Sequence, residues 1–158
     1  MKRLLKFYRY VFAWENYLLL ARVIRAAWLV RKYLPENIPS PHFASALGVV
    51  EKLYLPTQPG WTISSDEKVV RFASFVINFP FEWGKCVQQS LIVYRLLNGY
   101  GIPARICFGV SQDDSSTDGH AWVIRLDEPE RAIAETVDPR ERFKLVYASP
   151  LPVLGQRV

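Results

Sequence analysis

Three kinds of side chain that can carry out acyl transfer follow one another along the sequence. Cys86 precedes an amphipathic stretch, His120 opens a mostly apolar one, and carboxylates come after it. A thiolate can attack a carbonyl carbon, an imidazole can move the proton, and a carboxylate can fix the tautomer of the imidazole and stabilise its cation. The order Cys, His, acid therefore predicts a cysteine-based acyl-transfer site.

Cys86 stands where a helix would activate it. It follows Pro80 and Gly84 and opens a run of apolar residues spaced three or four apart, so we expect its thiol at a helix N-terminus. The free backbone N–H groups there, together with the charge of Lys85, lower the pKa of a thiol from its usual value of about 8.5. The alternative is that Cys86 only packs in the core. Cys107, inside an expected strand, is predicted to be structural.

Of the two histidines, His120 is the candidate base. It follows Gly119 and a polar stretch and begins an expected strand, which would give its side chain access to the edge of a cleft. The alternative for His120 is a hydrogen-bonded core histidine. His42 lies in a Pro-rich linker, where a surface or capping role is expected.

Three acids are candidates for the group that orients His120: Asp127, Glu135 and Asp138. The register of a β-hairpin decides between them, because side chains alternate between the two faces of a strand. In the register that we predict, Glu135 shares a face with His120, Asp138 points the other way, and Asp127 lies in the turn. Glu135 is therefore the favoured acid and Asp138 the alternative, while an ion pair with an arginine would explain Glu135 without catalysis.

The predicted register comes from a four-residue turn, residues 127–130, which pairs Leu126 with Arg131. We favour it because it gathers large apolar side chains of both strands on one face and leaves mostly small or polar ones on the other. The predicted core face holds Trp122, Ile124, Ile133 and Val137.

The rest of the pattern predicts helices first and an antiparallel sheet afterwards. We expect one or two N-terminal helices before a Pro-rich break at residues 34–42, then helices at 43–55, after Ser64 or Ser65, and from Cys86 to Asn98. Strands are expected at residues 102–110, 120–126 and 131–137. The fold class is therefore α+β. We expect one domain, residues 1–158, with a helical part (1–60) and a core in which the Cys-bearing helix packs on a small sheet (61–158).

Positive charge is concentrated near the N-terminus. The net charge is +5, but residues 1–34 hold eight Lys or Arg and one acid, which leaves 12 basic and 14 acidic residues for the remainder. We predict no nucleic-acid partner and keep contact with a membrane surface as a possible role of this segment. No run reaches the ~20 apolar residues of a membrane span. The expected packed face of the N-terminal helix is Leu20, Val23, Ile24 and Ala27.

Other classes of site have no support in the sequence. Two Cys and two His without ligand spacing indicate no metal site, and phosphate-loop and dinucleotide glycine motifs are absent, so we expect no cofactor. Two cysteines make no disulfide framework, which favours free thiols and a cytoplasmic location.

Three stretches together resemble a known family. "KCVQQSLIVYRLLNGYGIPARICFGV", "GHAWVIRL" and "AETVDPRERF" resemble the transglutaminase-like leader peptidases of lasso-peptide biosynthesis, in their split form. The resemblance implies a papain-like cysteine protease that removes the leader of a ribosomally made precursor peptide, with nucleophile Cys86 and base His120. The third member in that family is commonly Asp, and here Glu135 stands at the matching position.

The resemblance also implies partners: the precursor peptide, a separate leader-recognition protein and an ATP-dependent macrolactam cyclase. Two other functions stay open on the residues alone. The same triad could serve a transglutaminase-like amidase or acyltransferase, because these residues do not determine whether water or an amine accepts the acyl group. Alternatively, the chain could be a non-catalytic peptide-binding module that docks through its basic N-terminus.

Overall fold

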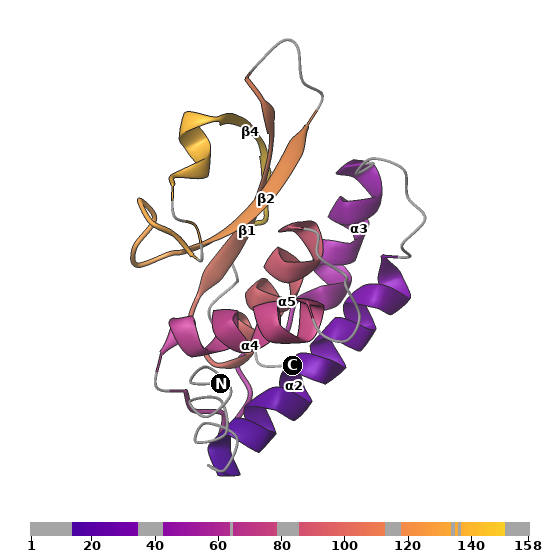
Figure 1. The fold of residues 1–158 in the computed structure, drawn as a ribbon, viewed down its shortest axis with the longest axis vertical. Helices are drawn as coiled ribbons and strands as arrows, with labels where there is room; N and C mark the ends of the chain where they lie inside the picture. The colour runs from indigo at the N-terminus through magenta and orange to yellow at the C-terminus, as the bar shows by residue number, and fades with distance from the viewer. Residues whose placement is uncertain are drawn as a thin grey trace, which may run out of the picture.

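Helices precede strands in the computed structural model, which describes residues 14–34, 43–63, 65–78, 86–112, 118–133, 135 and 137–150 (Figure 1). The helices within these ranges are α2 (Trp14–Tyr33), α3 (Phe43–Leu53), α4 (Asp66–Asn78) and α5 (Cys86–Gly99). The strands are β1 (Ala104–Ser111), β2 (Gly119–Arg125), β3 (Ala132–Ile133) and β4 (Phe143–Ala148), with a 3₁₀ turn, η1 (Pro139–Glu141), before β4. The prediction of an α+β fold with a small antiparallel sheet is confirmed.

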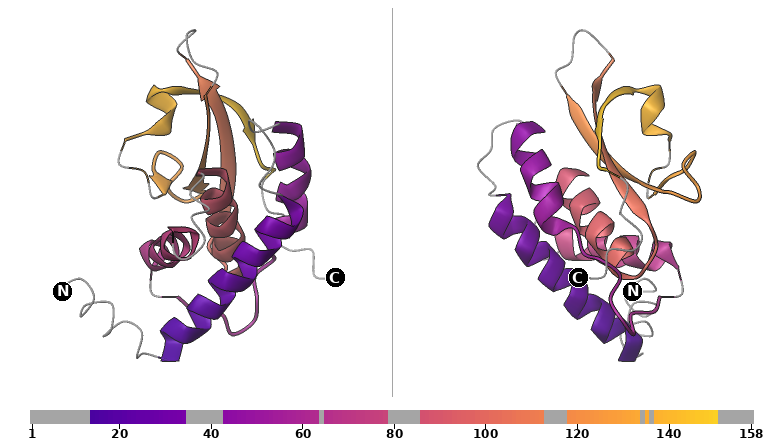
Figure 2. Two further views of the ribbon diagram at one scale, coloured as in Figure 1. Left: turned by 45° about the vertical axis from the view of Figure 1, so that its right-hand side comes forward. Right: turned by 180° about the vertical axis from the view of Figure 1, so that it is seen from behind.

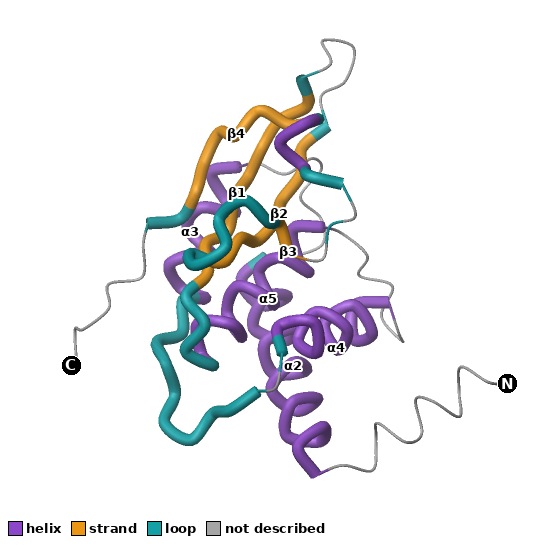
Figure 3. Tube along the Cα trace, turned by 90° about the vertical axis from the view of Figure 1, so that its left-hand side faces the viewer, coloured by secondary structure: helices purple, strands orange, loops and turns teal. Residues whose placement is uncertain are grey.

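The sheet has the order β3-β2-β1-β4, and each neighbouring pair is antiparallel. Helix α5 lies between the sheet and α2, which runs along the outside of the molecule (Figures 1 and 2). Helix α4 crosses beside α5 below the short edge formed by β3 (Figure 3). This arrangement brings the first turn of α5 against β2.

The main core forms around α5 because this helix is apolar nearly all round. From Ser90 to Gly99 every residue except Arg95 is buried, as expected for a helix covered on several sides. Helix α4 adds buried Val69, Phe72 and Val76, spaced to lie on one face. The sheet contributes small side chains where α5 approaches it most closely, including Ala104 and Ala121.

A second, smaller cluster lies on the other face of the sheet. It consists of buried Cys107, Trp122 and Ala132, with Ile124, Phe143 and Ala148 packed against it. Both faces of β2 are therefore buried, with Ala121 and Val123 toward the main core and Trp122 toward the second cluster.

The predicted hairpin register is wrong. Val123 pairs with Ile133 and Ile124 with Ala132, a shift of one residue from the expected pairing. Strand β2 ends at Arg125 and β3 begins at Ala132, so residues 126–131 connect them and the connection is longer than four residues. Because β2 is buried on both faces, the alternation of large and small residues did not identify one core face.

Other elements differ in extent from their predictions. The expected strand at 131–137 is reduced to the two residues of β3, and β4 is a strand that we did not predict. Ile24, expected on the packed face of α2, is 49% exposed, whereas Val23 and Ala27 are buried as expected. None of the helices in the described ranges has both the length and the apolar composition needed to cross a bilayer.

Candidate active site

Cys86 is the first residue of α5, as predicted, and its thiol faces β2. One turn later, the buried hydroxyl of Ser90 donates to the backbone carbonyl of Ala121 at 2.8 Å. Residues four apart lie on the same side of a helix, so this bond fixes the side of α5 that carries Cys86 against the strand that carries His120. The sulfur of Cys86 in turn accepts hydrogen bonds from the backbone at Ala121 and Val87.

His120 lies near the start of β2, where the sheet has an open edge. Among the described residues, β3 pairs with Val123 and Ile124, so this part of the ladder does not reach His120. The imidazole stacks on Phe143, with ring centroids 5.0 Å apart and planes at 22°, and on Trp122 at 6.2 Å and 16°. Trp122 is part of the second cluster and Phe143 packs against it, so both rings contact the imidazole on that face of the sheet and restrict its orientation.

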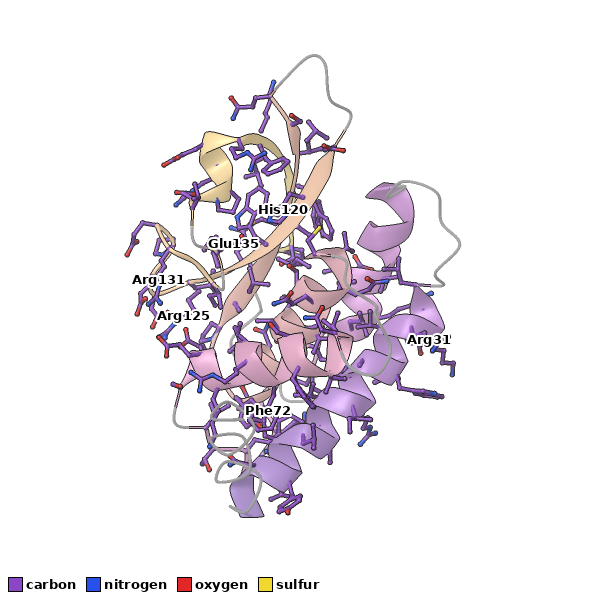
Figure 4. The ribbon with its side chains drawn as sticks, in the orientation of Figure 1. Arg31, Phe72, His120, Arg125, Arg131 and Glu135 are labelled. Atoms are coloured by element: carbon purple, nitrogen blue, oxygen red, sulfur yellow. The ribbon has the colours of Figure 1, made fainter. Side chains whose placement is uncertain are left out.

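Glu135 reaches His120 from beyond the end of β3. Its Oε1 atom lies 3.0 Å from Nε2 of His120 (Figure 4). The imidazole also hydrogen bonds to the Cys86 thiol. Since Nε2 faces Glu135, Nδ1 is the ring nitrogen left for the sulfur. The structure thus joins Cys86, His120 and Glu135 in one chain of contacts, with the imidazole in the middle.

The two hydrogen bonds change the proton affinities of the thiol and the imidazole in opposite directions. The hydrogen bonds of His120 to Cys86 and to Glu135 raise its pKa to about 9, against a smaller opposing effect of burial. Burial raises the pKa of Cys86, but the bond from His120, the backbone N–H of Ala121 and the imidazolium charge outweigh it and lower that pKa. The thiol therefore loses its proton more readily than the imidazolium, which favours a thiolate–imidazolium pair.

The three side chains open into a cavity of about 280 Å³ between α4, α5 and the hairpin of β2 and β3. The lining combines apolar and polar side chains, and it includes Gln89, whose amide donates to Ser74 Oγ at 2.8 Å. A pocket with an apolar lining and a few polar groups suits a peptide side chain beside the reacting carbonyl. The apolar lining residues are Ile77, Val93, Ala121, Val123 and Ile133.

The other sequence candidates lie elsewhere. Asp138 caps η1 and binds the guanidinium of Arg140, and Asp127 binds Arg125, so neither carboxylate is the partner of His120. Cys107 is buried, and burial raises the pKa of its thiol to about 11, in agreement with a structural role. His42 lies outside the described residues.

Phe143 and Arg140 are two neighbours of the site that the sequence analysis did not single out. Phe143 stacks on His120, and Arg140 ties the turn before β3 to Asp138 through the carbonyls of Pro129 and Glu130. Both residues belong to the "AETVDPRERF" stretch. Its final pair, Arg142 and Phe143, was the available signal for Phe143, whereas no signal marked Arg140.

Within the described residues, no group of three or more His, Cys, Asp or Glu side chains is arranged to hold a metal ion. The chemistry available to the described groups is nucleophilic attack by sulfur with proton transfer by an imidazole.

Comparison with known proteins adds one finding. A family model described as "Transglutaminase-like superfamily" matches residues 61–148, more than half of the chain. This range contains Cys86, His120, Glu135 and all four strands. Neither the curated proteins nor the solved structures give a significant match.

Proposed function

The chain belongs to the transglutaminase-like superfamily, and from that premise we propose that it is a cysteine peptidase that removes the leader from a ribosomally made lasso precursor peptide. The observation that carries the proposal is the contact chain from Cys86 through His120 to Glu135 at the mouth of a cavity. Membership of the superfamily supports the part of the proposal that makes the chain a papain-like cysteine enzyme. The proposed substrate, a lasso precursor peptide, rests on the resemblance of "GIPAR", "GHAW" and "AETVDPRERF" to the lasso leader peptidases.

In the first half of the proposed reaction, the Cys86 thiolate attacks the carbonyl carbon that links leader and core peptide. The carbonyl π electrons move to oxygen, and the backbone N–H groups at the start of α5 are placed to stabilise that oxyanion. The His120 imidazolium then gives its proton to the departing nitrogen of the core peptide. The leader remains bound to sulfur as a thioester.

In the second half, water takes the place of the core peptide. Neutral His120 removes a proton from the water as its oxygen attacks the thioester carbon, and the carbon–sulfur bond breaks. The leader leaves as a carboxylic acid, and the thiolate–imidazolium pair is restored. Glu135 stays ionised throughout and holds His120 in the orientation that serves both halves.

The proposed setting includes two further proteins. A separate leader-recognition protein would present the precursor, and an ATP-dependent macrolactam cyclase would close the ring after cleavage. In this setting the cavity at Cys86 would receive the scissile bond, and the leader would be bound by the recognition protein.

The test is incubation of the purified chain with a candidate precursor and recognition protein, followed by mass spectrometry. We expect two fragments whose masses sum to that of the precursor plus one water, and no fragments with Cys86→Ala. A product that carries an added amine instead of water would identify an acyltransferase. A precursor that stays intact under all conditions, with Cys86 no more reactive toward iodoacetamide than a free thiol at pH about 6, would identify a binding module.

A further inference from the structure

The outward face of α2 carries an exposed apolar stripe that neither the core nor the active site uses. Tyr17, Ile24 and Trp28 are 43%, 49% and 58% exposed, and exposed Ala21 lies between them. Spacings of four, three and four residues place these side chains on one side of the helix. The opposite side of α2 packs on α4 and α5, so the stripe faces away from the rest of the described chain (Figures 1 and 2).

Basic side chains border this stripe on both sides. At about 100° per residue, Arg31 falls on one flank, and Arg25 and Lys32 fall on the other; all three are exposed. The Lys32 ammonium lies 5.6 Å from the ring of Trp28, so charge and apolar surface meet directly. Lys52 of α3 adds a further ammonium 5.7 Å from the ring of Tyr33 at the end of α2.

Basic residues outnumber acidic ones in α2. The helix contains Arg22, Arg25, Arg31 and Lys32 against one acid, Glu15, and the residues before α2 add Lys2, Arg3, Lys6 and Arg9 to the sequence. In contrast, the chain after residue 34 carries slightly more acid than base. The outward face of α2 therefore lies on the basic side of the molecule.

We propose that this face of α2 binds an anionic membrane surface, with the helix lying parallel to the bilayer. An apolar stripe that enters the headgroup region, a tryptophan at the interface and basic residues at the flanks are the features of such helices. Charge favours this occupant over a second copy of the chain, because joining two such faces would bring basic flanks together. The proposal does not depend on the peptidase reaction.

The position of the catalytic groups is compatible with this orientation. The cavity at Cys86 is lined by residues of α4, α5, β2 and the segment of β3 and Glu135, and α2 contributes none of its lining. In Figure 4, Arg31 lies on the outer side of α2, away from His120 and Glu135. A membrane against α2 therefore leaves the cavity open to a peptide.

The test is sedimentation of the full chain with vesicles of phosphatidylcholine alone or mixed with phosphatidylglycerol. We expect binding to the anionic vesicles that weakens as salt is added, and much weaker binding to neutral ones. The double variants Ile24→Ser/Trp28→Ser and Arg25→Glu/Lys32→Glu should each reduce the partition coefficient by at least about tenfold. The matched control is Leu145→Ser/Val146→Ser, which removes exposed apolar residues from β4 and should leave binding unchanged.

Thermal unfolding of each variant checks the fold, which exposed substitutions should preserve. Equal binding to neutral and anionic vesicles, or binding that survives both α2 variants, would overturn the proposal. So would absence of vesicle binding together with a dimer in light scattering that Ile24→Ser/Trp28→Ser dissociates, because this face would then be an interface between two copies.

Discussion

Nε2 of His120 lies 3.0 Å from Oε1 of Glu135, although the ladder between β2 and β3 ends at Ile133. If β3 continued in its observed register, Glu135 would lie opposite Ala121, with its side chain on the face away from His120. Glu135, however, belongs to no strand, and its carboxylate lies at His120 instead. The acid therefore reaches the imidazole from outside the regular pairing.

The first prediction concerns the three side chains of this contact chain. Cys86→Ala and His120→Ala should abolish precursor cleavage, because one removes the nucleophile and the other the group that transfers its proton. Glu135→Ala should reduce kcat/KM by a smaller factor, about 10²–10⁴, since it removes only the group that orients the imidazole. Cleavage rates from mass spectrometry, with circular dichroism as a fold check, test this order.

Asp127→Ala is the control for the loss of a carboxylate. Asp127 binds Arg125 in the exposed turn and is not among the residues that line the cavity, so its removal should leave cleavage close to the rate of the unaltered chain. A loss as large as that of Glu135→Ala would show that charge in the hairpin, and not contact with His120, determines the rate.

The second prediction concerns pH. Cleavage should rise with pH as the thiol, whose pKa is lowered, becomes a thiolate, and should fall above pH about 9 as His120 loses the proton that it gives to the leaving nitrogen. Glu135→Gln removes one of the two groups that raise the pKa of His120. Its alkaline limb should therefore move to lower pH, measured as kcat/KM against pH and by NMR titration of the imidazole. An alkaline limb unmoved in Glu135→Gln would contradict the role of this contact.

The parts of the fold that follow from local pattern could be predicted from the sequence. Apolar residues three or four apart predicted α5, and the preceding Pro80 and Gly84 predicted its start at Cys86. The start of β2 near His120 followed in the same way from its boundary with a polar stretch. Both predictions depend on neighbours in the chain.

The parts that depend on distant contacts could not be predicted in this way. Strand β2 is buried on both faces, so its pattern does not report one core face, and the register derived from it is wrong. Glu135 is close to His120 even so, but from a position outside the ladder, which the alternation of residues in a strand does not predict. Phe143 reaches the imidazole from β4, a strand whose place beside β1 depends on the whole sheet.

The third prediction is that Arg140 positions Glu135 without touching it. Its guanidinium binds the Asp138 carboxylate, with Nε to Oδ1 at 2.9 Å, and the carbonyls of Pro129 and Glu130. These contacts join the chain before and after the segment that carries Glu135. Arg140→Ala should lower kcat about tenfold with little change in KM, because a small misplacement of an orienting group affects mainly the chemical step.

Two measurements separate positioning by Arg140 from a general loss of stability. If Glu135 is displaced, the alkaline limb of the Arg140→Ala profile should shift toward lower pH, as in Glu135→Gln. The control is Arg131→Ala, which removes an exposed arginine of the same hairpin with one longer contact to Glu128 at 3.8 Å. An unshifted limb in Arg140→Ala, with lower thermal stability alone, would contradict the positioning role.

The fourth prediction uses Gly109, which pairs with His120 across β1 and β2. A Cβ at this position would lie 2.9 Å from Phe143 Cβ, 2.9 Å from the ring of Trp122 and 3.0 Å from the backbone oxygen of Lys144. Two of these atoms belong to the side chains of Phe143 and Trp122, whose rings stack on His120, so Gly109→Ala must move these side chains. We expect a loss of about 1–3 kcal/mol in the free energy of unfolding, together with reduced kcat.

Gly48→Ala is the matched control for this change. Gly48 is exposed in α3, and an added Cβ there meets nothing within 4 Å, so the substitution should stabilise the helix by roughly 0.5–1 kcal/mol. Denaturant unfolding and cleavage rates are measured for both variants. The added methyl group meets open space at Gly48 and the side chains that stack on His120 at Gly109. If Gly109→Ala unfolds at the same denaturant concentration as the unaltered chain and cleaves at the same rate, the stacked rings do not fix the imidazole.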